Sequence, residues 1–128
     1  MKKILVIDDD TSTTESIAIY LEEIGYEVFS AHNGLEGLNV IKENEPDLII
    51  SDVRMPEING IELCLILKGL NYSIPVILIS AHDLNFGFSE NDFSIHAFIS
   101  KPINIFELIN YINEVFLKNR GVGNVCLN

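Results

Sequence analysis

The sequence is poor in cysteine and in basic residues, and each shortage excludes a class of protein. Cys64 and Cys126 are the only cysteines, too few for a disulfide framework or a cysteine metal cluster, so we expect a reducing compartment such as the cytoplasm. The chain has 8 Lys or Arg residues and 19 Asp or Glu residues, a formal net charge of −11. This balance repels phosphate backbones and anionic lipids, which disfavours nucleic acid and membranes as partners.

The sequence also has no long hydrophobic run. No stretch approaches the roughly 18 to 20 apolar residues of a membrane span, and the apolar stretch after Met1 is too short for a signal peptide. Apolar residues nevertheless make up 48% of the 128 residues, which is enough for the core of one compact domain. We expect this domain at residues 1–118, with residues 119–128 as a C-terminal tail or the start of a linker.

Short apolar segments rich in Val, Ile and Phe alternate with longer periodic segments. The short segments predict β-strands, at Lys3–Ile7, Tyr26–Ser30, Leu48–Ser51, Pro75–Ser80 and Ala97–Ser100. The first, third and fourth are apolar at consecutive positions, which is typical of strands that are buried on both faces of a parallel sheet.

The longer segments carry apolar residues at the spacing of one helix face. These stripes are Ile17, Tyr20, Leu21 and Ile24; Leu35, Leu38 and Ile41; Ile61, Cys64 and Leu65; and Ile105, Leu108, Ile109, Ile112 and Phe116. Gly25 is predicted to end the first helix, and Asn104 to cap the last one. The segment His82–Ile95 lacks a clear stripe and predicts either a short helix capped by Ser89 or a loop.

The alternation predicts an α/β fold with a doubly wound, five-stranded parallel sheet and helices on both faces. Ligands of such folds bind beyond the carboxyl ends of the strands. Four predicted strand ends carry polar residues, which are Asp8-Asp9-Asp10, Asp52, Ser80 and Lys101-Pro102. Alone, each has a simpler explanation, such as a helix cap for Asp10. Together they predict a site in which carboxylates hold Mg²⁺ and a lysine pairs with a phosphoryl oxygen.

Five blocks of the sequence resemble the signature blocks of response-regulator receiver domains, in order and at nearly the family's spacing. They are ILVIDDD, GYEVFSAHNGLEGL, PDLIISDVRMPEINGIEL, PVILISA and AFISKP. The most specific is the Asp-x-x-Met-Pro-x-x-x-Gly motif from Asp52 to Gly60. The resemblance, which extends over roughly residues 2–118, implies a flavodoxin-like (βα)5 fold with strand order 2-1-3-4-5.

The resemblance also implies roles for single residues. Asp52 would accept a phosphoryl group from a phosphohistidine, so the domain would be a regulatory switch rather than an enzyme. Ser80 would be the switch hydroxyl and Phe98 the aromatic switch residue. Lys101 would contact a phosphoryl oxygen, and its bond to Pro102 would be cis.

A magnesium site follows from the same resemblance. Asp9 and Asp52 would bind Mg²⁺ through their side chains, Asp8 would act through water, and the backbone carbonyl of Arg54 would be a further ligand. The Arg54 side chain would lie near the phosphoryl entry path. There it would either slow attack by water or steer a partner, or else remain solvated. The scattered His32, His82 and His96 predict no metal site.

Some positions depart from the family's pattern. The interval from Ser80 to Lys101 is slightly short, and Ser94-Ile95 replaces the usual Gly-Ala before the last strand. These differences predict an atypical or shortened fourth helix, and therefore an atypical output surface. Gly37 lies within the second predicted helix, where glycine costs about 1 kcal/mol relative to alanine.

Two other functions fit parts of the sequence. A pseudo-receiver would serve as a docking module without phosphorylation, but such proteins usually lose the acidic pair, the phosphoacceptor or the lysine, and none is lost here. A haloacid-dehalogenase-like phosphatase would use Asp8 and Asp10 in a nucleophile loop. That family needs another acidic pair after the lysine, whereas only Glu107 and Glu114 follow Lys101.

The expected partners are proteins that exchange or read a phosphoryl group. They are a sensor histidine kinase or a histidine phosphotransfer protein, and a downstream effector protein or a fused output domain. Residues after 118 are too few for an effector, so both a stand-alone regulator and a receiver from a longer protein agree with the sequence.

Overall fold

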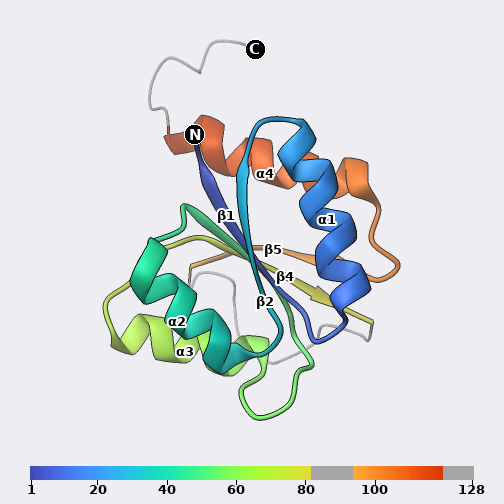
Figure 1. Cartoon of the computed structure of the whole chain (residues 1–128). Coiled ribbons are helices and arrows are strands. Elements are labelled where there is room, and N and C mark those ends of the chain that lie inside the picture. Colours follow the sequence, from blue (N-terminus) through green and yellow to red (C-terminus); the bar gives the residue numbers. More distant parts are fainter. Residues whose placement is uncertain (82–93, 120–128) are drawn as a thin grey trace.

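Five parallel strands form one sheet in the order β2-β1-β3-β4-β5 (Figure 1). The computed structural model describes residues 1–81 and 94–119. The strands are β1 Lys3–Ile7, β2 Glu27–Ala31, β3 Leu48–Asp52, β4 Val76–Ser80 and β5 Ile95–Ser100. The helices are α1 Thr11–Glu23, α2 Gly34–Asn44, α3 Gly60–Gly69 and α4 Ile105–Asn119. The predicted fold class and strand order are confirmed.

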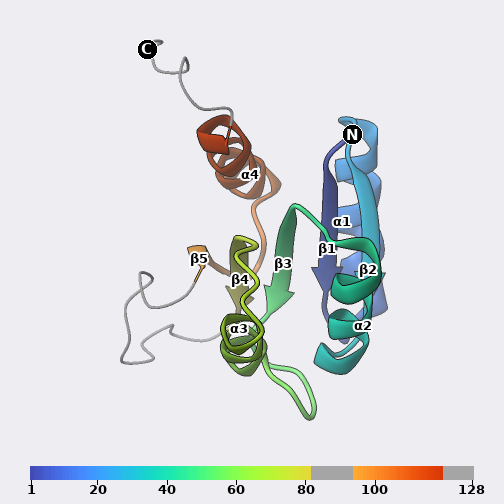
Figure 2. The ribbon, with the colours of Figure 1, turned by 90° about the vertical axis from the view of Figure 1, so that its left-hand side faces the viewer.

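The helices cover both faces of the sheet and divide the core into two clusters. On one face, residues of α1 and α4, such as Leu21 and Leu108, pack against Ile50 of β3. On the other face, residues of α2 and α3, such as Ile41 and Leu63, form the second cluster. Figure 1 shows the resulting three layers, and in Figure 2 α2 and α3 lie on the near side of the sheet. Residues of the central strands β1, β3 and β4 are almost all buried, which explains their continuous apolar runs.

The edge strand β5 begins earlier than the sequence predicts. Val76 pairs with Ile95, whereas Ile77 pairs with Ala97, so His96 is an extra residue on the β5 side of the ladder. Such a β-bulge breaks the alternation of side chains by which strands are recognised in sequence. The assignment of Ile95 to the uncertain segment was therefore wrong. The expected fourth helix and its cap Ser89 lie outside the described residues.

The predicted helix stripes are only partly correct. Ile17 and Leu21 of α1 are buried, but Tyr20 and Ile24 are each 51% exposed. Leu35 of α2 and Leu65 of α3 are also about half exposed. A helix that packs on one sheet face buries only a narrow strip, so apolar residues beside that strip remain in solvent. The stripe of α4 is buried at Leu108, Ile112 and Phe116.

The predicted helix ends agree with the structure. The Asn104 side chain accepts hydrogen bonds from the backbone N–H groups of Phe106 and Glu107, at 2.9 and 3.3 Å, and thereby caps α4. Gly25 follows α1 with φ of 106°, a conformation that glycine adopts without strain. A Cβ atom on Gly37 would lie 2.6 Å from Cδ1 of the buried Ile7, so close packing of α2 on β1 explains the glycine inside this helix. Within the described residues, no helix is long and apolar enough to cross a membrane.

Candidate functional site

The carboxyl ends of four strands bring the predicted polar residues to one edge of the sheet. Asp8 follows β1, Asp52 ends β3, Ser80 ends β4 and Lys101 follows β5. Backbone hydrogen bonds continue past the strand ends, from Lys101 N to the Ser80 carbonyl at 2.8 Å and from Asp8 N to the Ala31 carbonyl at 3.1 Å. A third bond, from Val53 N to the Ile79 carbonyl at 2.8 Å, holds the end of β3 against β4 beside Asp52.

Lys101 lies between two buried carboxylates. Its Nζ atom is 3.2 Å from Oδ2 of Asp52 and 3.5 Å from Oδ2 of Asp8. Burial lowers the pKa of Lys101, but the charges of Asp52 and Asp8 and the hydrogen bonds to them outweigh this effect and raise the pKa above its ordinary value. The ammonium group therefore stays protonated and partly balances the carboxylates.

The carboxylates of Asp8, Asp9 and Asp52 form a cluster in which the potential ligand oxygens all lie within 4.8 Å of one another. Asp8 and Asp52 are buried, whereas Asp9 is exposed. Burial is the largest cause of the raised pKa of Asp8; the charge of Asp52 raises this pKa further, and the hydrogen bond from Asp10 N and the Lys101 ammonium oppose the shift.

This cluster fits a hard divalent cation. Three ionised carboxylates carry a charge of −3 and Lys101 carries +1, so the ionised cluster has a net charge of −2. Carboxylate oxygens from two strand ends are the donors that Mg²⁺ prefers. A divalent cation would also offset the repulsion between carboxylates that raises the pKa of Asp8.

The Asp10 side chain has a different role from those of Asp8 and Asp9. Its Oδ1 atom accepts a hydrogen bond from Ser12 N at 2.9 Å and caps α1. Its own backbone N–H donates to Oδ1 of Asp8 at 2.9 Å. Asp10 thus begins the helix and orients the Asp8 carboxylate, and it is not part of the carboxylate cluster.

The loop between β3 and α3 is held close to Asp52. The backbone N–H of Gly60 donates to the Val53 carbonyl at 2.8 Å, and a Cβ atom on Gly60 would lie 2.6 Å from the carbonyl oxygen of Asp52. Asn59 and Glu62 form a capping box at the start of α3. Glycine is therefore required at position 60, which is the last position of the motif that begins at Asp52.

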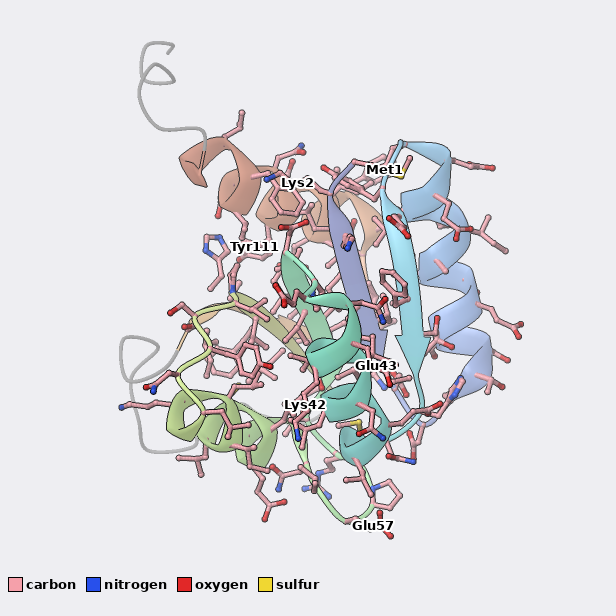
Figure 3. All side chains as sticks on the ribbon, turned by 60° about the vertical axis from the view of Figure 1, so that its left-hand side comes forward. Met1, Lys2, Lys42, Glu43, Glu57 and Tyr111 are labelled. Atoms are coloured by element: carbon pink, nitrogen blue, oxygen red, sulfur yellow. The ribbon has the colours of Figure 1, made fainter. Side chains whose placement is uncertain are left out.

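A pocket of about 520 Å³ adjoins the cluster on the side of this loop. Its lining residues are Asp9, Val53, Arg54, Met55, Pro56 and Asn59. Arg54 is exposed. Figure 3 shows Glu57 at the outer end of the same loop, at the opposite end of the molecule from Met1 and Lys2.

The two remaining predicted residues lie on adjacent strands. Ser80 is buried at the end of β4, and Phe98 of β5 is partly buried against the core cluster on the α2 and α3 side. Phe98 pairs with Leu78, two residues before Ser80. The bond between Lys101 and Pro102 is cis, as the family resemblance implies.

Two buried hydroxyl groups near the site were not anticipated from the sequence. Ser51 donates to the carbonyl of Asp52 at 2.9 Å. Thr14 donates to the carbonyl of Thr11 at 3.0 Å, and its Oγ1 atom lies 3.5 Å from Nε2 of His32. Ser51 is the last residue of a predicted strand and Thr14 precedes the first predicted helix stripe, and at such positions a single hydroxyl gives no signal of burial.

The model of the response regulator receiver domain family matches residues 4–113 of the chain. Among curated proteins, the response regulator MprA of Mycobacterium tuberculosis is 40% identical over 81 residues, which are 63% of this chain. A probable transcriptional regulatory protein of Picosynechococcus is 36% identical over 120 residues, covering 84% of this chain. The matches span only 35% of the mycobacterial protein and 46% of the cyanobacterial one.

Solved structures resemble this fold over almost its whole length. A CheY-like response regulator receiver domain protein from Methanospirillum hungatei has a TM-score of 0.86 and 30% identity, covering 96% of this chain and 99% of its own. TrrA from Thermotoga maritima, solved in complex with Mg²⁺ and BeF, has a TM-score of 0.80 and 30% identity, covering 90% of this chain and 99% of its own.

Proposed function

Because the chain belongs to the family of response regulator receiver domains, we propose that it is a phosphorylation-dependent switch with Asp52 as the phosphoacceptor. One observation carries this proposal. The Asp52 carboxylate lies in a cluster of three carboxylates and 3.2 Å from the Lys101 ammonium. Of the three, Asp52 is the one that lies within a strand, as the last residue of the middle strand β3, and the motif from Asp52 to Gly60 is the most specific of the sequence.

The proposed reaction is a phosphoryl transfer from a phosphohistidine. A carboxylate oxygen of Asp52 forms a bond to phosphorus while the bond from phosphorus to the imidazole nitrogen breaks, and its electron pair remains on that nitrogen. Lys101 leaves its ion pair with Asp52 and contacts a phosphoryl oxygen, and the Ser80 hydroxyl donates to another. Such a reaction depends mainly on positioning and on neutralising the charge of the phosphoryl oxygens.

The proposed cation is Mg²⁺, which supplies positive charge beside the phosphoryl oxygens when bound. Asp9 and Asp52 would hold it by their side chains, Asp8 through water, and Arg54 by its backbone carbonyl. The support is the net charge of −2 of the ionised cluster and the family relation to TrrA, whose structure contains Mg²⁺ and BeF.

Ser80 and Phe98 are the proposed switch residues. A phosphoryl group on Asp52 would draw the Ser80 hydroxyl toward it, and Phe98 would change its packing on β5 in response. Their positions on paired strands, with Ser80 opposite Ser100 and Phe98 opposite Leu78, support a coupling through the β4–β5 pair. The signal would then reach the surface around β5 and α4.

The proposed partners follow from the receiver family. A sensor histidine kinase or a histidine phosphotransfer protein would donate the phosphoryl group in the cytoplasm. An effector protein, or an output domain in the same chain, would read the switch. The probable transcriptional regulatory protein of Picosynechococcus is about twice as long as its region that matches this chain. This length supports an output domain in the same chain as one candidate.

Incubation with Mg²⁺ and phosphoramidate, followed by intact-mass measurement, tests the proposal. The wild-type chain should gain the mass of one phosphoryl group, and the gain should disappear when EDTA replaces Mg²⁺. Asp52→Asn should gain nothing, whereas Asp10→Asn should react because Asp10 caps α1. Failure of the wild-type chain to form any adduct would support the pseudo-receiver alternative instead.

A further inference from the structure

Three contacts hold the loop between β3 and α3 in its place. The first is the hydrogen bond from Gly60 N to the Val53 carbonyl, at 2.8 Å. The second is the capping box at the start of α3, to which Asn59 belongs. The third is a contact with α2, where Ile58 meets Gly34. Of the three, this last contact is the one that comes from outside the segment that runs from β3 to α3.

The contact between α2 and the loop leaves no room for a Cβ atom at position 34. Gly34 is the first residue of α2 and is buried. A Cβ atom here would lie 2.7 Å from Cβ, 2.8 Å from Cγ2 and 2.8 Å from the carbonyl oxygen of Ile58. The carbonyl oxygen and Cβ of Ile58 cannot turn away by rotation of the side chain, so a methyl group at position 34 would have to displace the backbone of the loop.

The middle of the loop depends on this contact because its backbone is strained. Glu57 has φ of 68°, a left-handed conformation that is unfavourable for a residue with a Cβ atom. The Ile58 backbone N–H donates to the Pro56 carbonyl at 2.8 Å and closes a tight turn around Glu57. Such a conformation persists only where neighbouring contacts hold it. Ile58, which packs against Gly34 and the core cluster on the α2 and α3 side, supplies these contacts.

The same loop carries groups of the proposed site on both sides of Ile58. The Arg54 carbonyl, a proposed ligand of Mg²⁺, precedes Ile58 in the loop, and Gly60, which lies against the Asp52 carbonyl oxygen, follows it. A displacement of Ile58 would therefore reach Arg54 in one direction and Asp52 in the other. Groups that orient the ligands of a metal from outside typically change its affinity by about 10–100-fold when they are altered.

We propose that Gly34 is a positioning residue for the phosphoacceptor site, because it allows Ile58 to hold the loop against the start of α2. The inference rests on the proposed function, since it takes the Arg54 carbonyl as a ligand of Mg²⁺. Gly34 is not a member of the carboxylate cluster, and it acts through Ile58. Its effect is therefore on the affinity for Mg²⁺ and on the Mg²⁺ concentration that phosphorylation of Asp52 requires.

A second glycine of the same helix provides a matched control. A Cβ atom on Gly37 would lie 2.6 Å from Cδ1 of Ile7, and the three nearest atoms all belong to Ile7. Gly37→Ala therefore disturbs the packing of α2 on β1 but not its contact with the loop. Ile58→Val keeps both side-chain atoms that lie against Gly34, which are Cβ and Cγ2, whereas Ile58→Gly removes both.

Three measurements are made on each variant. Calorimetric titration gives the Kd for Mg²⁺. Intact mass after reaction with phosphoramidate gives the Mg²⁺ concentration at which the rate is half-maximal, and chemical denaturation without Mg²⁺ gives the free energy of unfolding. A merely structural role would change the free energy of unfolding in Gly34→Ala and Gly37→Ala without separating their Kd values.

Gly34→Ala should raise the Kd for Mg²⁺ about tenfold, and the half-maximal Mg²⁺ concentration should rise by the same factor. Gly37→Ala and Ile58→Val should keep the wild-type Kd, and Ile58→Gly should raise it. In the Ile58→Gly background, Gly34→Ala should have a much smaller effect than in wild type, because two of the three overlapping atoms are absent.

Three results would overturn the inference. They are an unchanged Kd in Gly34→Ala, an equal rise in Gly37→Ala, and an undiminished effect of Gly34→Ala in the Ile58→Gly background. If Gly34→Ala does not fold, equal Kd values for Ile58→Val and Ile58→Gly overturn it instead. Each of these results leaves the phosphorylation of Asp52 intact when wild type forms its adduct. If wild type neither binds Mg²⁺ nor forms an adduct, the proposed function itself fails, and the inference fails with it.

Discussion

At the scale of single residues, Lys101 supplies a positive charge that contacts two of the three clustered carboxylates. Its ammonium contacts Asp52 and Asp8, at 3.2 and 3.5 Å, and it would compete with a divalent cation for the same carboxylates. The same ammonium would stabilise a phosphoryl group on Asp52. On the proposed function, Lys101 would weaken binding of the cation and strengthen phosphoryl transfer, so one substitution should change the two in opposite directions.

Lys101→Met should bind Mg²⁺ more tightly than wild type and react more slowly with a phosphodonor. Methionine keeps much of the side-chain volume but removes the positive charge, and the loss of one such contact to a developing anion typically costs about 10²–10³ in rate. Calorimetric titration gives the affinity, and intact mass gives the rate. Weaker Mg²⁺ binding in this variant would contradict the account of the cluster.

Cys64 belongs to the third predicted helix stripe and lies in the core cluster on the α2 and α3 side. It is buried in α3, and burial raises the pKa of its thiol from 9.0 to about 12. In a Cys126→Ser background, we expect Cys64 to react with a thiol reagent only after unfolding, because the reactive thiolate is absent from the native state at neutral pH.

The sign of the pH dependence follows from the same pKa. Above about pH 9 the thiol ionises in the unfolded chain but not in the folded one, so its contribution to the free energy of unfolding declines as the pH rises toward about 12. The labelling experiment has a clear contrary result. If the thiol reagent labels the native protein rapidly at neutral pH, and denaturant does not raise this rate, then the Cys64 thiol is accessible and the expected protection is absent.

At the scale of elements, the strands were predictable because burial on both faces leaves continuous apolar runs in β1, β3 and β4. The helix faces were less predictable. The sequence cannot show that Tyr20 and Leu65 lie beside the packed strip rather than within it, because that depends on how each helix is rotated on the sheet. The bulge at His96 was also not predictable from the sequence. The imidazole of His96 contacts residues of α4, with Glu114 at 2.8 Å and the Tyr111 ring at 6.0 Å, and the local sequence does not reveal such tertiary contacts.

The site residues were predictable for a different reason. Asp8, Asp52, Ser80 and Lys101 each follow or end a strand, and parallel strands place their carboxyl ends at one edge. Ser51 was missed because its hydroxyl turns toward its own chain, at 2.9 Å from the Asp52 carbonyl. Backbone contacts of this kind depend on local torsion angles that the pattern of residue types does not reveal.

The contact between α3 and the end of β3 gives a prediction at the element scale. Gly60→Ala should lower the free energy of unfolding by about 1–3 kcal/mol, since its Cβ would overlap the Asp52 carbonyl oxygen and force the backbone to move. It should also weaken Mg²⁺ binding, because Asp52 would shift. Gly69→Ala is the matched control, because nothing lies within 4 Å of its Cβ. If chemical denaturation shows the same change in the free energy of unfolding for both variants, the close approach of Gly60 to the Asp52 carbonyl is contradicted.

At the scale of the whole molecule, the sheet concentrates negative charge at one edge of a chain that already carries a net charge of −11. Two of the three clustered carboxylates are buried, so salt screens their repulsion poorly. A bound divalent cation would relieve this repulsion directly. The cation should therefore affect the stability of the whole domain as well as the site.

MgCl₂ should raise the Tm more than NaCl at equal ionic strength. A ligand at a hundredfold excess over its Kd adds about 2.7 kcal/mol to the free energy of unfolding. Asp9→Asn should lose most of this increment, because it removes a proposed ligand whose side chain is exposed. Thermal denaturation of both proteins in the two salts tests this, and equal shifts in MgCl₂ and NaCl would mean that Mg²⁺ acts only by screening.

The most direct test of the central claim is to locate the phosphoryl group on the chain. After reaction with phosphoramidate and Mg²⁺, reduction with borohydride converts an aspartyl phosphate into homoserine, which peptide mass spectrometry assigns to one position. We predict homoserine at position 52, with the aspartates at positions 8 and 9 unchanged. Homoserine at position 8 or 9, or at no position in a protein that has gained phosphoryl mass, would contradict the assignment of Asp52 as the phosphoacceptor.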